Sequence, residues 1–267
     1  MGKNKLPYIF IFDIDNCIIG NVEYPIYEYE LMQLIKNNCN KKDVLKKCKK
    51  YIDFVKELKQ GLLRPYFSEF IKFIKKTYKT CEIYVYTNSS YTWTYNGLVY
   101  NIEKAAKMKF NKPYFTRDYS HFDMSKSLTN VLNVIFKKLK KKYPLLNYKK
   151  FRYEVFNNRL IFIDNIKDNL ADFPNKQLTC PEYKFNKKYN VLNKILRKYK
   201  IKKSELNKKE INNYINTKLL INKNKKNNTY RDIFFKKLIK ELKKINKNIN
   251  NKNINNKNIK KLNFELN

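Results

Sequence analysis

Short apolar runs, each followed by a polar or acidic residue, recur along the chain. Residues 7–12 (PYIFIF) form such a run directly before two carboxylates, and residues 159–164 (RLIFID) end in a carboxylate. Between them, the run at 81–87 (CEIYVYT) ends at a threonine. Runs of this length that are rich in β-branched and aromatic residues indicate buried strands. We predict these three strands and a further one at 113–116 (PYFT).

Segments of helical periodicity separate the predicted strands. The stretch from about 27 to 60 has apolar residues at helical spacing and is followed by Gly61, which predicts a small helical hairpin inserted at 21–62. This insert is a candidate for a small cap over a site. Pro65 suits the first turn of a helix with an apolar face formed by Phe67, Phe70, Ile71 and Ile74.

Two further helices are predicted before the last strand. Ser90 is expected to cap a helix that runs to about Met108, and Asp123 or Ser125 is expected to cap a helix that runs to Lys142. Strands that alternate with helices in this way predict an α/β fold, with a mostly parallel central sheet flanked by helices.

The character of the chain changes near residue 200. Of the last 67 residues, 18 are lysine and 18 are asparagine. We therefore divide the chain into a domain at 1–200 and a basic tail at 201–267 that is helical or partly disordered. In the tail, Thr229 and Asp232 precede an amphipathic pattern with Phe234, Leu238, Leu242 and Ile245 on one face. Such a helix can dock its apolar face on the domain, or bind nucleic acid, a membrane or a partner groove.

The chain is strongly basic, with 59 Lys and Arg against 23 Asp and Glu and a formal charge of +36. This charge favours an anionic partner such as nucleic acid, a membrane surface or a phosphorylated substrate. A compositional bias toward lysine and asparagine explains the charge equally well, because only six of the basic residues are arginine.

The cysteines and the N-terminal residues bear on the compartment. Five widely spaced cysteines without a C-x-x-C pair argue against a disulfide framework or a zinc ribbon. The first apolar run is too short for a signal peptide or a membrane span. We therefore expect an intracellular protein, in the cytoplasm or the nucleus.

Polar side chains follow the first two predicted strands. Asp13 and Asp15 lie two residues apart on an extended backbone, so both carboxylates can face one site, where a cation such as Mg²⁺ would balance their charges. Thr87 stands where a hydroxyl and the backbone N–H groups before a helix can hold phosphate oxygens. Each signal also has a structural explanation, since D-x-D is common in loops and Ser/Thr-rich stretches often cap helices.

Two more candidate elements lie further along the chain. Lys126 stands near the start of a predicted helix and could neutralise a phosphate and a carboxylate. Asp164, Asn165 and Asp168 follow the third apolar run and supply oxygen ligands at its end. Acids at a helix N-terminus, which the helix dipole favours, are the structural alternative for this last group.

Taken in order, these elements resemble the four motifs of the haloacid dehalogenase-like (HAD) superfamily. FDIDNCIIG resembles the first motif, VYTNSS the second, the lysine of DMSKSL the third and IFIDNIKDN the fourth. An Arg-Pro pair before the helix that leads into VYTNSS, FTRD at 115–118 and the Asp-Asn of the fourth motif are similar to the RNA polymerase II C-terminal-domain phosphatases. The resemblance covers about residues 7–185 and implies a Rossmann-like fold. Asn16 and Cys17 depart from the usual Gly and Thr or Val; Asn adopts left-handed backbone readily, and Cys17 is expected to be a small buried side chain.

The resemblance implies roles for the residues of the first three motifs. Asp13 would attack phosphorus and form an aspartyl-phosphate. Asp15 would protonate the leaving oxygen and then deprotonate the incoming water. Thr87, Asn88 and Lys126 would bind the phosphate oxygens.

The resemblance also implies a metal and a reaction. Mg²⁺ would be held by Asp13, Asp15 and Asp164, with Asn165 and Asp168 in supporting positions. The implied activity is Mg²⁺-dependent hydrolysis of a phosphomonoester, on a phosphoprotein carrying Ser or Thr phosphate or on another macromolecule. Two alternatives remain open: a phosphatase of nucleic-acid ends or nucleotides, and a catalytically inactive HAD-like basic module that binds nucleic acid or protein.

Overall fold

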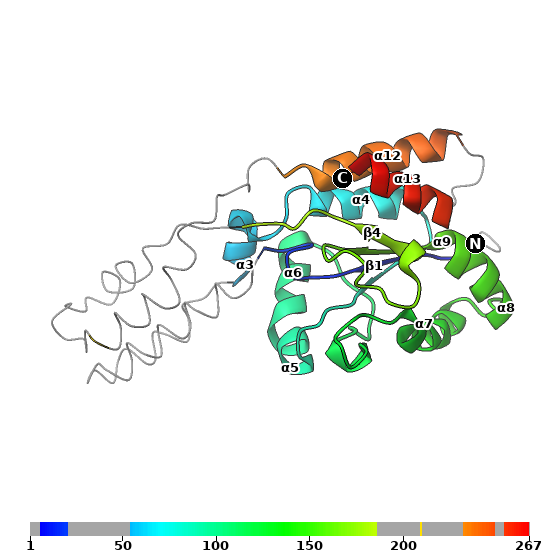
Figure 1. The fold of residues 1–267 in the computed structure, drawn as a ribbon, viewed down its shortest axis with the longest axis horizontal. Coiled ribbons are helices and arrows are strands. Elements are labelled where there is room, and N and C mark those ends of the chain that lie inside the picture. Colours follow the sequence, from blue (N-terminus) through cyan, green and yellow to red (C-terminus); the bar gives the residue numbers. More distant parts are fainter. Residues whose placement is uncertain (1–5, 21–53, 186–208, 210–231, 249–253, 267) are drawn as a thin grey trace.

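The computed structural model describes residues 6–20, 54–185, 209, 232–248 and 254–266 (Figure 1). Its centre is one sheet of four parallel strands in the order β2-β1-β3-β4. The strands are β1 (Tyr8–Phe12), β2 (Cys81–Val85), β3 (Leu160–Asp164) and β4 (Gln177–Thr179). The first three are the strands predicted from the apolar runs, and the parallel α/β architecture is confirmed.

The expected strand at 113–116 is wrong. In this segment only Phe115 pairs with the sheet, through an isolated parallel bridge to Tyr86 beyond the end of β2. The backbone then turns into a short 3-10 helix, η3 (Arg117–Tyr119). The apolar residues Tyr114 and Phe115 are buried, so the pattern reports burial here rather than an extended strand.

Both faces of the sheet are covered, which explains why β1 is apolar at every position. Tyr8, Phe10 and Phe12 belong to the core on one face, whereas Ile9 and Ile11 belong to the core on the other face. Helices α4 (Phe67–Thr77), α12 (Phe234–Asn248) and α13 (Asn256–Leu266) lie on the first side in Figure 1, and α7 (Leu128–Lys142) lies on the second.

Helix α4 (Phe67–Thr77) forms as predicted, because its apolar residues recur at helical spacing. The face expected from the sequence is the one that the structure buries, with Phe67, Phe70, Ile71 and Ile74 all in the core. Phe67 and Phe70 meet Phe12 of β1 in edge-on ring contacts, with centroids 5.5 and 6.1 Å apart.

The helical segment after β2 consists of α5 (Tyr91–Trp93), η2 (Thr94–Leu98) and α6 (Val99–Ala106). Ser90 caps it as expected, since its hydroxyl accepts a hydrogen bond from the Trp93 backbone N–H at 3.4 Å. Lys107, with a φ of 54°, ends the segment in a left-handed conformation close to the predicted end.

Helix α7 (Leu128–Lys142) begins later than expected, and neither Asp123 nor Ser125 caps it. The cap is Ser127, whose hydroxyl accepts from the Asn130 backbone N–H at 3.2 Å. Lys126 is held extended before this point by a parallel bridge to Leu170, which moves the helix start past it.

The remaining helices of the domain are short. Most of the expected insert at 21–62, namely residues 21–53, lies outside the described part. The chain resumes in a helical segment that ends at Leu62, and Gly61 inside its last turn has a φ of 115°, close to the predicted helix stop. These short helices are α3 (Phe54–Glu57), η1 (Leu58–Leu62), α8 (Tyr148–Lys150), η4 (Phe151–Phe156), α9 (Asn157–Arg159) and η5 (Pro174–Lys176).

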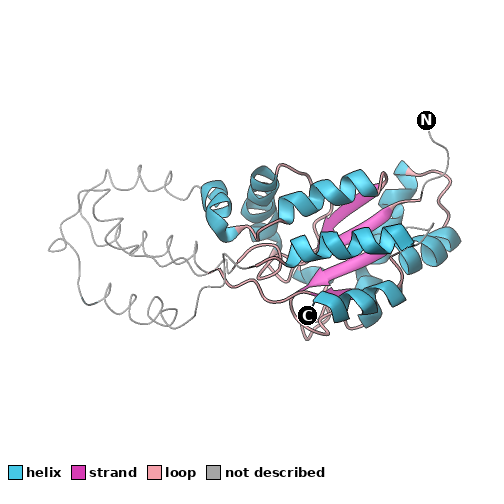
Figure 2. Ribbon diagram, turned by 90° about the horizontal axis from the view of Figure 1, so that it is seen from above, coloured by secondary structure: helices cyan, strands magenta, loops and turns pink. Residues whose placement is uncertain are grey.

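Two helices from the basic tail complete the core, namely α12 (Phe234–Asn248) and α13 (Asn256–Leu266). Phe235 of α12 packs between Phe67 and Phe70, with ring centroids 5.3 and 5.2 Å away. Figure 2 shows helices laid across this face of the strands. Of the alternatives for the amphipathic tail helix, docking on the domain is the one observed, so the described tail segments share the core of the 1–200 domain.

A buried ion pair fixes the start of α12. Arg64, 1% exposed, donates from Nε and Nη2 to the two carboxylate oxygens of Asp232 at 3.0 and 2.8 Å. Its guanidinium also lies over the Phe234 ring, 4.7 Å from the centroid. Within the described ranges, no helix has the length and apolar character needed to cross a bilayer.

Candidate active site

The carboxyl ends of β1, β2 and β3 bring three of the four motifs to one edge of the sheet. Phe12 is in register with Val85 of β2 and with Ile163 of β3. The backbone N–H of Asp13 donates to the Ile163 carbonyl at 2.8 Å, so the first and fourth motifs stay side by side past the strand ends. Because β1 lies between its two neighbours, this edge is the switch point at which open α/β sheets bind ligands.

Lys126 joins the two acidic strand ends. Its ammonium lies 2.5 Å from Asp13 Oδ1 and 2.8 Å from Asp164 Oδ2, and its side chain is 1% exposed. Burial alone would lower the pKa of Lys126, but the two carboxylates raise it above its ordinary value. The lysine is therefore a fixed cation within the site.

The position of Lys126 depends on its backbone. Its N–H donates to the Asn169 carbonyl at 2.8 Å, and its own carbonyl accepts from the Ala171 N–H at 3.1 Å. These two bonds align the segment before α7 with the segment after the fourth motif. The side chain can therefore reach both carboxylates although it comes from neither strand.

Asp13 is almost fully buried, at 5% exposure. Burial raises the pKa of its carboxyl, and contact with the Lys126 ammonium limits that rise. The lysine thus favours the ionised form, which is the form able to act as a nucleophile.

Asp15 has a different environment from Asp13. Its Oδ2 accepts hydrogen bonds from the hydroxyls of Ser89 at 3.0 Å and Thr87 at 3.3 Å. Its Oδ1 is buried and has no hydrogen-bond partner among the described residues. Burial raises the pKa of Asp15, and the Ser89 bond opposes the rise. A carboxyl with a raised pKa and one free oxygen is suited to carry a proton.

The loop after β2 contributes through its hydroxyls. Thr87 is fully buried beside Asp15, and its Oγ1 also accepts from the Ser89 backbone N–H at 3.2 Å. The Asn88 side chain joins loops instead: Nδ2 donates to the Met124 carbonyl at 2.7 Å, and Oδ1 accepts from the Ser120 hydroxyl at 2.8 Å. Phosphate binding by Asn88 would therefore use its backbone N–H rather than its amide.

Asp164 holds the fourth motif together. Its Oδ2 accepts from Lys126 and from the Asn169 side-chain amide, both at 2.8 Å. Its Oδ1 accepts from the Ile166 backbone N–H at 2.8 Å. The support expected from Asp168 comes from Asn169, because Asp168 has a φ of 57° and is exposed.

Asn165 lies against the first motif. With its nitrogen facing them, the amide donates to the Asp15 carbonyl oxygen at 2.9 Å and to Asp13 Oδ2 at 3.3 Å. With the amide oxygen of Asn165 in that place, it lies against the Asp15 carbonyl oxygen and Asp13 Oδ2, and no hydrogen lies between the three oxygens. A bound cation would relieve the repulsion between them. This donor set of one carboxylate, one carbonyl and one amide fits a hard divalent cation. No metal-holding group of three or more His, Cys, Asp or Glu side chains occurs in the described ranges, so a cation here depends on the carbonyl and the amide.

Two residues of this site were missed by the sequence analysis. Ser89 belongs to a Ser/Thr-rich stretch before a helix, a pattern that predicts a helix cap, and its bond to Asp15 spans 74 positions. Asn169 lies one position beyond the residue that was expected. The fourth-motif loop turns at Asp168, which points Asn169 inward, and the local pattern holds no signal for that turn.

Asn16 and Cys17 behave as the sequence predicts. Asn16 has a φ of 55°, the left-handed conformation that its glycine-like position requires. Cys17 is fully buried, with its Sγ 3.6 Å from the Ile163 carbonyl and 3.6 Å from the Cys180 Sγ. The turn after the first motif is thereby packed against β3.

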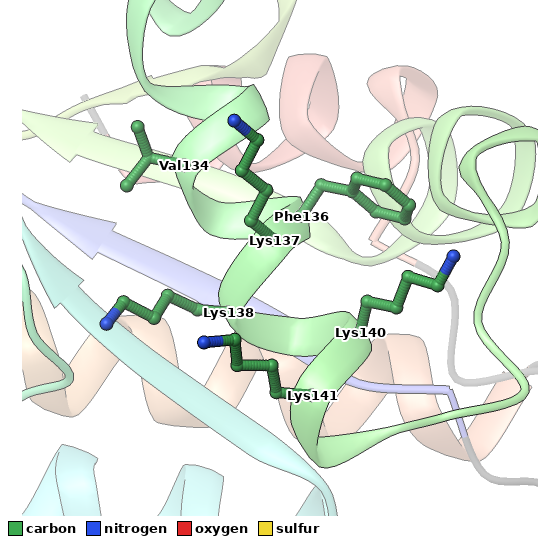
Figure 3. Close-up of a pocket in the computed structure, with 6 residues that line it drawn as sticks. All are labelled: Val134, Phe136, Lys137, Lys138, Lys140 and Lys141. Atoms are coloured by element: carbon green, nitrogen blue, oxygen red, sulfur yellow. The ribbon is translucent and has the colours of Figure 1, made fainter.

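A surface cavity of about 660 Å³ lies elsewhere, along the outer side of α7 (Figure 3). At the end of α7, Tyr143 donates its hydroxyl to Glu82 near the start of β2, so this part of α7 is at the amino edge of the sheet. The cavity is therefore remote from the strand ends that carry the motifs. It is lined by Val134, Phe136, Lys137, Lys138, Lys140 and Lys141.

No family model and no curated protein matches the sequence. Among solved structures, the chain is similar to Fcp1, an essential RNA polymerase II CTD phosphatase, at 17% identity and a TM-score of 0.44, covering 90% of this chain and 62% of that one. It is also similar to the fission yeast RNA polymerase II CTD phosphatase Fcp1 bound to beryllium fluoride, at 14% identity and a TM-score of 0.42, covering 90% and 63%. The chain spans less than two thirds of the length of either structure. With its all-parallel sheet flanked by helices, the chain has the Rossmann-like α/β architecture that its motifs predicted.

Proposed function

We propose that this chain is a Mg²⁺-dependent phosphomonoester hydrolase that works through an aspartyl-phosphate on Asp13. The observation that carries the proposal is the convergence of residues far apart in the sequence on one buried cluster. Lys126 bridges Asp13 and Asp164, which are 151 positions apart (164 minus 13), and Asp15 lies beside them with a free oxygen. A structural ion pair alone would not need a third carboxyl whose Oδ1 has no hydrogen-bond partner among the described residues.

Asp13 is the proposed nucleophile. Its carboxylate attacks phosphorus in line, forming a carboxyl–phosphate bond as the bond to the leaving oxygen breaks. Water then attacks phosphorus and restores the carboxylate. Splitting hydrolysis into two displacements makes each step easier, and the Lys126 ammonium, 2.5 Å from Asp13 Oδ1, favours the ionised form of the attacking carboxyl.

Asp15 is the proposed acid and base. Its raised pKa lets the carboxyl keep a proton for the leaving oxygen in the first step. In the second step, the carboxylate accepts a proton from the incoming water. The hydroxyls of Thr87 and Ser89 hold Oδ2, which leaves Oδ1 to exchange the proton.

Lys126 and the Thr87 loop would stabilise the transferred phosphoryl group. The ammonium is a preorganised positive charge, and such groups contribute most in buried sites, where little reorganisation is needed. Thr87 lies at the same carboxyl edge beside Asp15, and the loop that follows it leads into α5.

Asp13 Oδ2, the Asp15 carbonyl and Asn165 would hold the metal. We propose Asn165 as a direct ligand in place of Asp164, because both oxygens of Asp164 already accept hydrogen bonds. When bound, Mg²⁺ would neutralise phosphate charge that one lysine cannot balance alone.

A phosphorylated protein is the substrate class that we favour. The motif resemblance is to phosphatases of the RNA polymerase II C-terminal domain, and the structures similar to this chain carry that description. The alternative, a nucleic-acid end, is favoured by the formal charge of +36. However, the lysine-lined cavity of α7 lies at the opposite edge of the sheet from Asp13.

Hydrolysis of p-nitrophenyl phosphate tests the proposal. We expect turnover by the full chain with Mg²⁺, none after EDTA treatment, and recovery when Mg²⁺ is added back. Asp13→Asn should abolish turnover, while Asp168→Asn, at an exposed position of the same loop system, should retain it. Activity that persists in Asp13→Asn would contradict the assigned nucleophile, and a complete lack of turnover by the natural sequence would favour the binding-module alternative.

A further inference from the structure

Helix α7 and the segment that follows it form a basic stretch without a single acidic residue. Residues 128–153 contain eight lysines and arginines and neither aspartate nor glutamate. One of these residues, Lys142, pairs with Glu82 at 2.6 Å. The four lysines that line the α7 cavity form no ion pair within the described part of the chain. No carboxylate of that part therefore neutralises their charge.

Aromatic side chains accompany these lysines. Phe136 lines the cavity and precedes Lys140 by four positions, so the two side chains are neighbours on the helix surface. Figure 3 shows the Phe136 ring between the side chains of Lys137 and Lys140. Tyr148 of α8 meets the Phe136 ring edge-on, with centroids 5.3 Å apart, and is 50% exposed. We call Phe136, Tyr148 and the four cavity lysines the α7 basic surface.

The lysine bias of the whole chain does not account for this combination. Helix α12 carries six lysines, but it also contains Glu241, which pairs with Lys244 at 2.8 Å. The aromatic residues of α12, Phe234 and Phe235, are buried in the core. The α7 basic surface is therefore distinguished by its accessible rings and its lack of acids rather than by its number of lysines.

Exposed lysines beside accessible rings match the chemistry of a single-stranded nucleic acid. Lysine binds backbone phosphates as a point charge, and unpaired bases stack on aromatic side chains. A duplex would use the lysines alone, because its base faces are already stacked, and a phosphorylated peptide has no bases. The cavity volume of about 660 Å³ lies in the usual range of ligand pockets.

We propose that the α7 basic surface binds single-stranded nucleic acid, without sequence preference and away from the candidate active site. The end of α7 lies at the amino edge of the sheet, where Tyr143 donates its hydroxyl to Glu82, whereas Asp13 lies at the carboxyl edge. The bound strand would hold the protein on a nucleic acid and would not be the substrate of Asp13. This inference goes beyond the proposed phosphatase function and does not depend on it.

Fluorescence anisotropy of the full chain with a labelled oligothymidylate tests the proposal. The strand has about 15 nucleotides, near the upper limit of a single binding site, and carries no terminal phosphate. The measurement is made in EDTA over a range of salt concentrations. The test variant replaces four lysines with glutamine, namely Lys137, Lys138, Lys140 and Lys141. We expect it to bind at least about tenfold more weakly and to reduce the slope of log K against log salt by up to about 3, since each lost phosphate contact removes about 0.7.

A matched variant removes the same charge from the opposite face of the sheet. It replaces four exposed lysines of α12 with glutamine, namely Lys237, Lys240, Lys243 and Lys247. We expect its affinity for the strand to change by less than about threefold, because charges far from the bound strand are screened. Equal losses in the two fourfold variants would show that total charge binds the strand, and the proposal would be overturned.

The aromatic part of the surface is tested separately. Tyr148→Ala should weaken binding of the single strand about tenfold, because a stacking ring is lost, and leave binding of a duplex of the same length unchanged. Tyr100→Ala is the control, since Tyr100 is similarly exposed (57%) but belongs to α6. Circular dichroism checks that each variant is folded. If Tyr148→Ala changes the affinities for both nucleic acids equally, or changes neither, the surface does not recognise single strands.

Two competition measurements complete the test. A multiply phosphorylated peptide that displaces the strand at an equal or lower concentration would assign the surface to a phosphoprotein instead. Competitive inhibition of p-nitrophenyl phosphate hydrolysis by the oligothymidylate would place the strand at Asp13 and would also overturn the proposal. Conversely, α7-dependent strand binding by a chain that hydrolyses no phosphoester would support this inference while the phosphatase function fails.

Discussion

The two edges of the central sheet use lysine in opposite ways. At the carboxyl edge, Lys126 is buried and shared between two carboxylates, so its charge is neutralised within the protein. Near the amino edge, α7 presents four lysines around an open cavity (Figure 3). A fixed buried cation stabilises a defined anion, whereas exposed lysines provide a screened, non-specific field. The high overall charge is thus a poor guide to the chemistry of the site.

The largest effect is expected from removing the buried lysine. Lys126→Met should reduce kcat/KM for p-nitrophenyl phosphate by about 10³-fold, because a preorganised phosphate contact is lost. It should also lower the free energy of unfolding by about 3 kcal/mol, since two buried carboxylates are left without their cation. Urea denaturation measures the second effect. Lys138→Met on the exposed side of α7 is the control, and comparable losses in both variants would remove the distinction between the two edges.

A second buried cation provides an independent comparison. Asp232→Ala leaves Arg64 without its carboxylate partner, so we expect a loss of about 3 kcal/mol in unfolding free energy. Glu241→Ala, which removes the exposed pair with Lys244, should have little effect on stability. Circular dichroism during urea titration measures both, and a stable Asp232→Ala would show that α12 does not depend on this ion pair.

Metal affinity should respond to the amide of the fourth motif. We expect Asn165→Ala to raise the Mg²⁺ concentration for half-maximal activity at least about tenfold, because it removes one of three proposed oxygen ligands. Asp168→Ala, three residues away and exposed, should leave the Mg²⁺ dependence unchanged. The reverse ranking would exclude Asn165 as a ligand.

The smallest effect on catalysis is expected at α7. Replacing Lys137, Lys138, Lys140 and Lys141 with glutamine should change kcat/KM for p-nitrophenyl phosphate by less than about twofold, since exposed charges at this distance are screened. If α7 binds nucleic acid, the same variant should bind DNA more weakly and with a smaller salt dependence. This design is preferable to deleting 201–267, because that deletion would uncover the core beneath Phe235. A large loss of phosphatase activity in the fourfold variant would contradict the separation of the two edges.

The sequence predicts the strands that carry the site because their signals are local. The runs that became β1, β2 and β3 are buried on both faces, so nearly every position is apolar. The start of α7 was misplaced because the bridge between Lys126 and Leu170 is a long-range contact that no local pattern contains. The docked position of α12 was one of several alternatives, since an amphipathic helix does not specify the surface that it covers.

The same distinction applies to the site. The sequence predicts four of the site residues because each comes at the end of an apolar run that forms a strand. These are Asp13, Asp15, Thr87 and Asp164, and the structure places them along one edge of the sheet. Ser89 and Asn169 were missed because their contacts depend on loop turns that form only in the folded chain. Asp168 is exposed, whereas its neighbour Asn169 faces inward and bonds Asp164. The residue pattern alone does not predict which of the two neighbours faces the site, because that depends on the backbone turn at Asp168.

The central claim is that phosphate transfers to Asp13, and trapping this intermediate tests it most directly. The enzyme would be mixed with p-nitrophenyl phosphate and Mg²⁺, quenched in acid, reduced with borohydride and digested for mass spectrometry. Reduction of an aspartyl-phosphate yields homoserine, which we predict at position 13 and not at position 15. Homoserine at another aspartate, or its absence from an enzyme that turns over the substrate, would contradict the account.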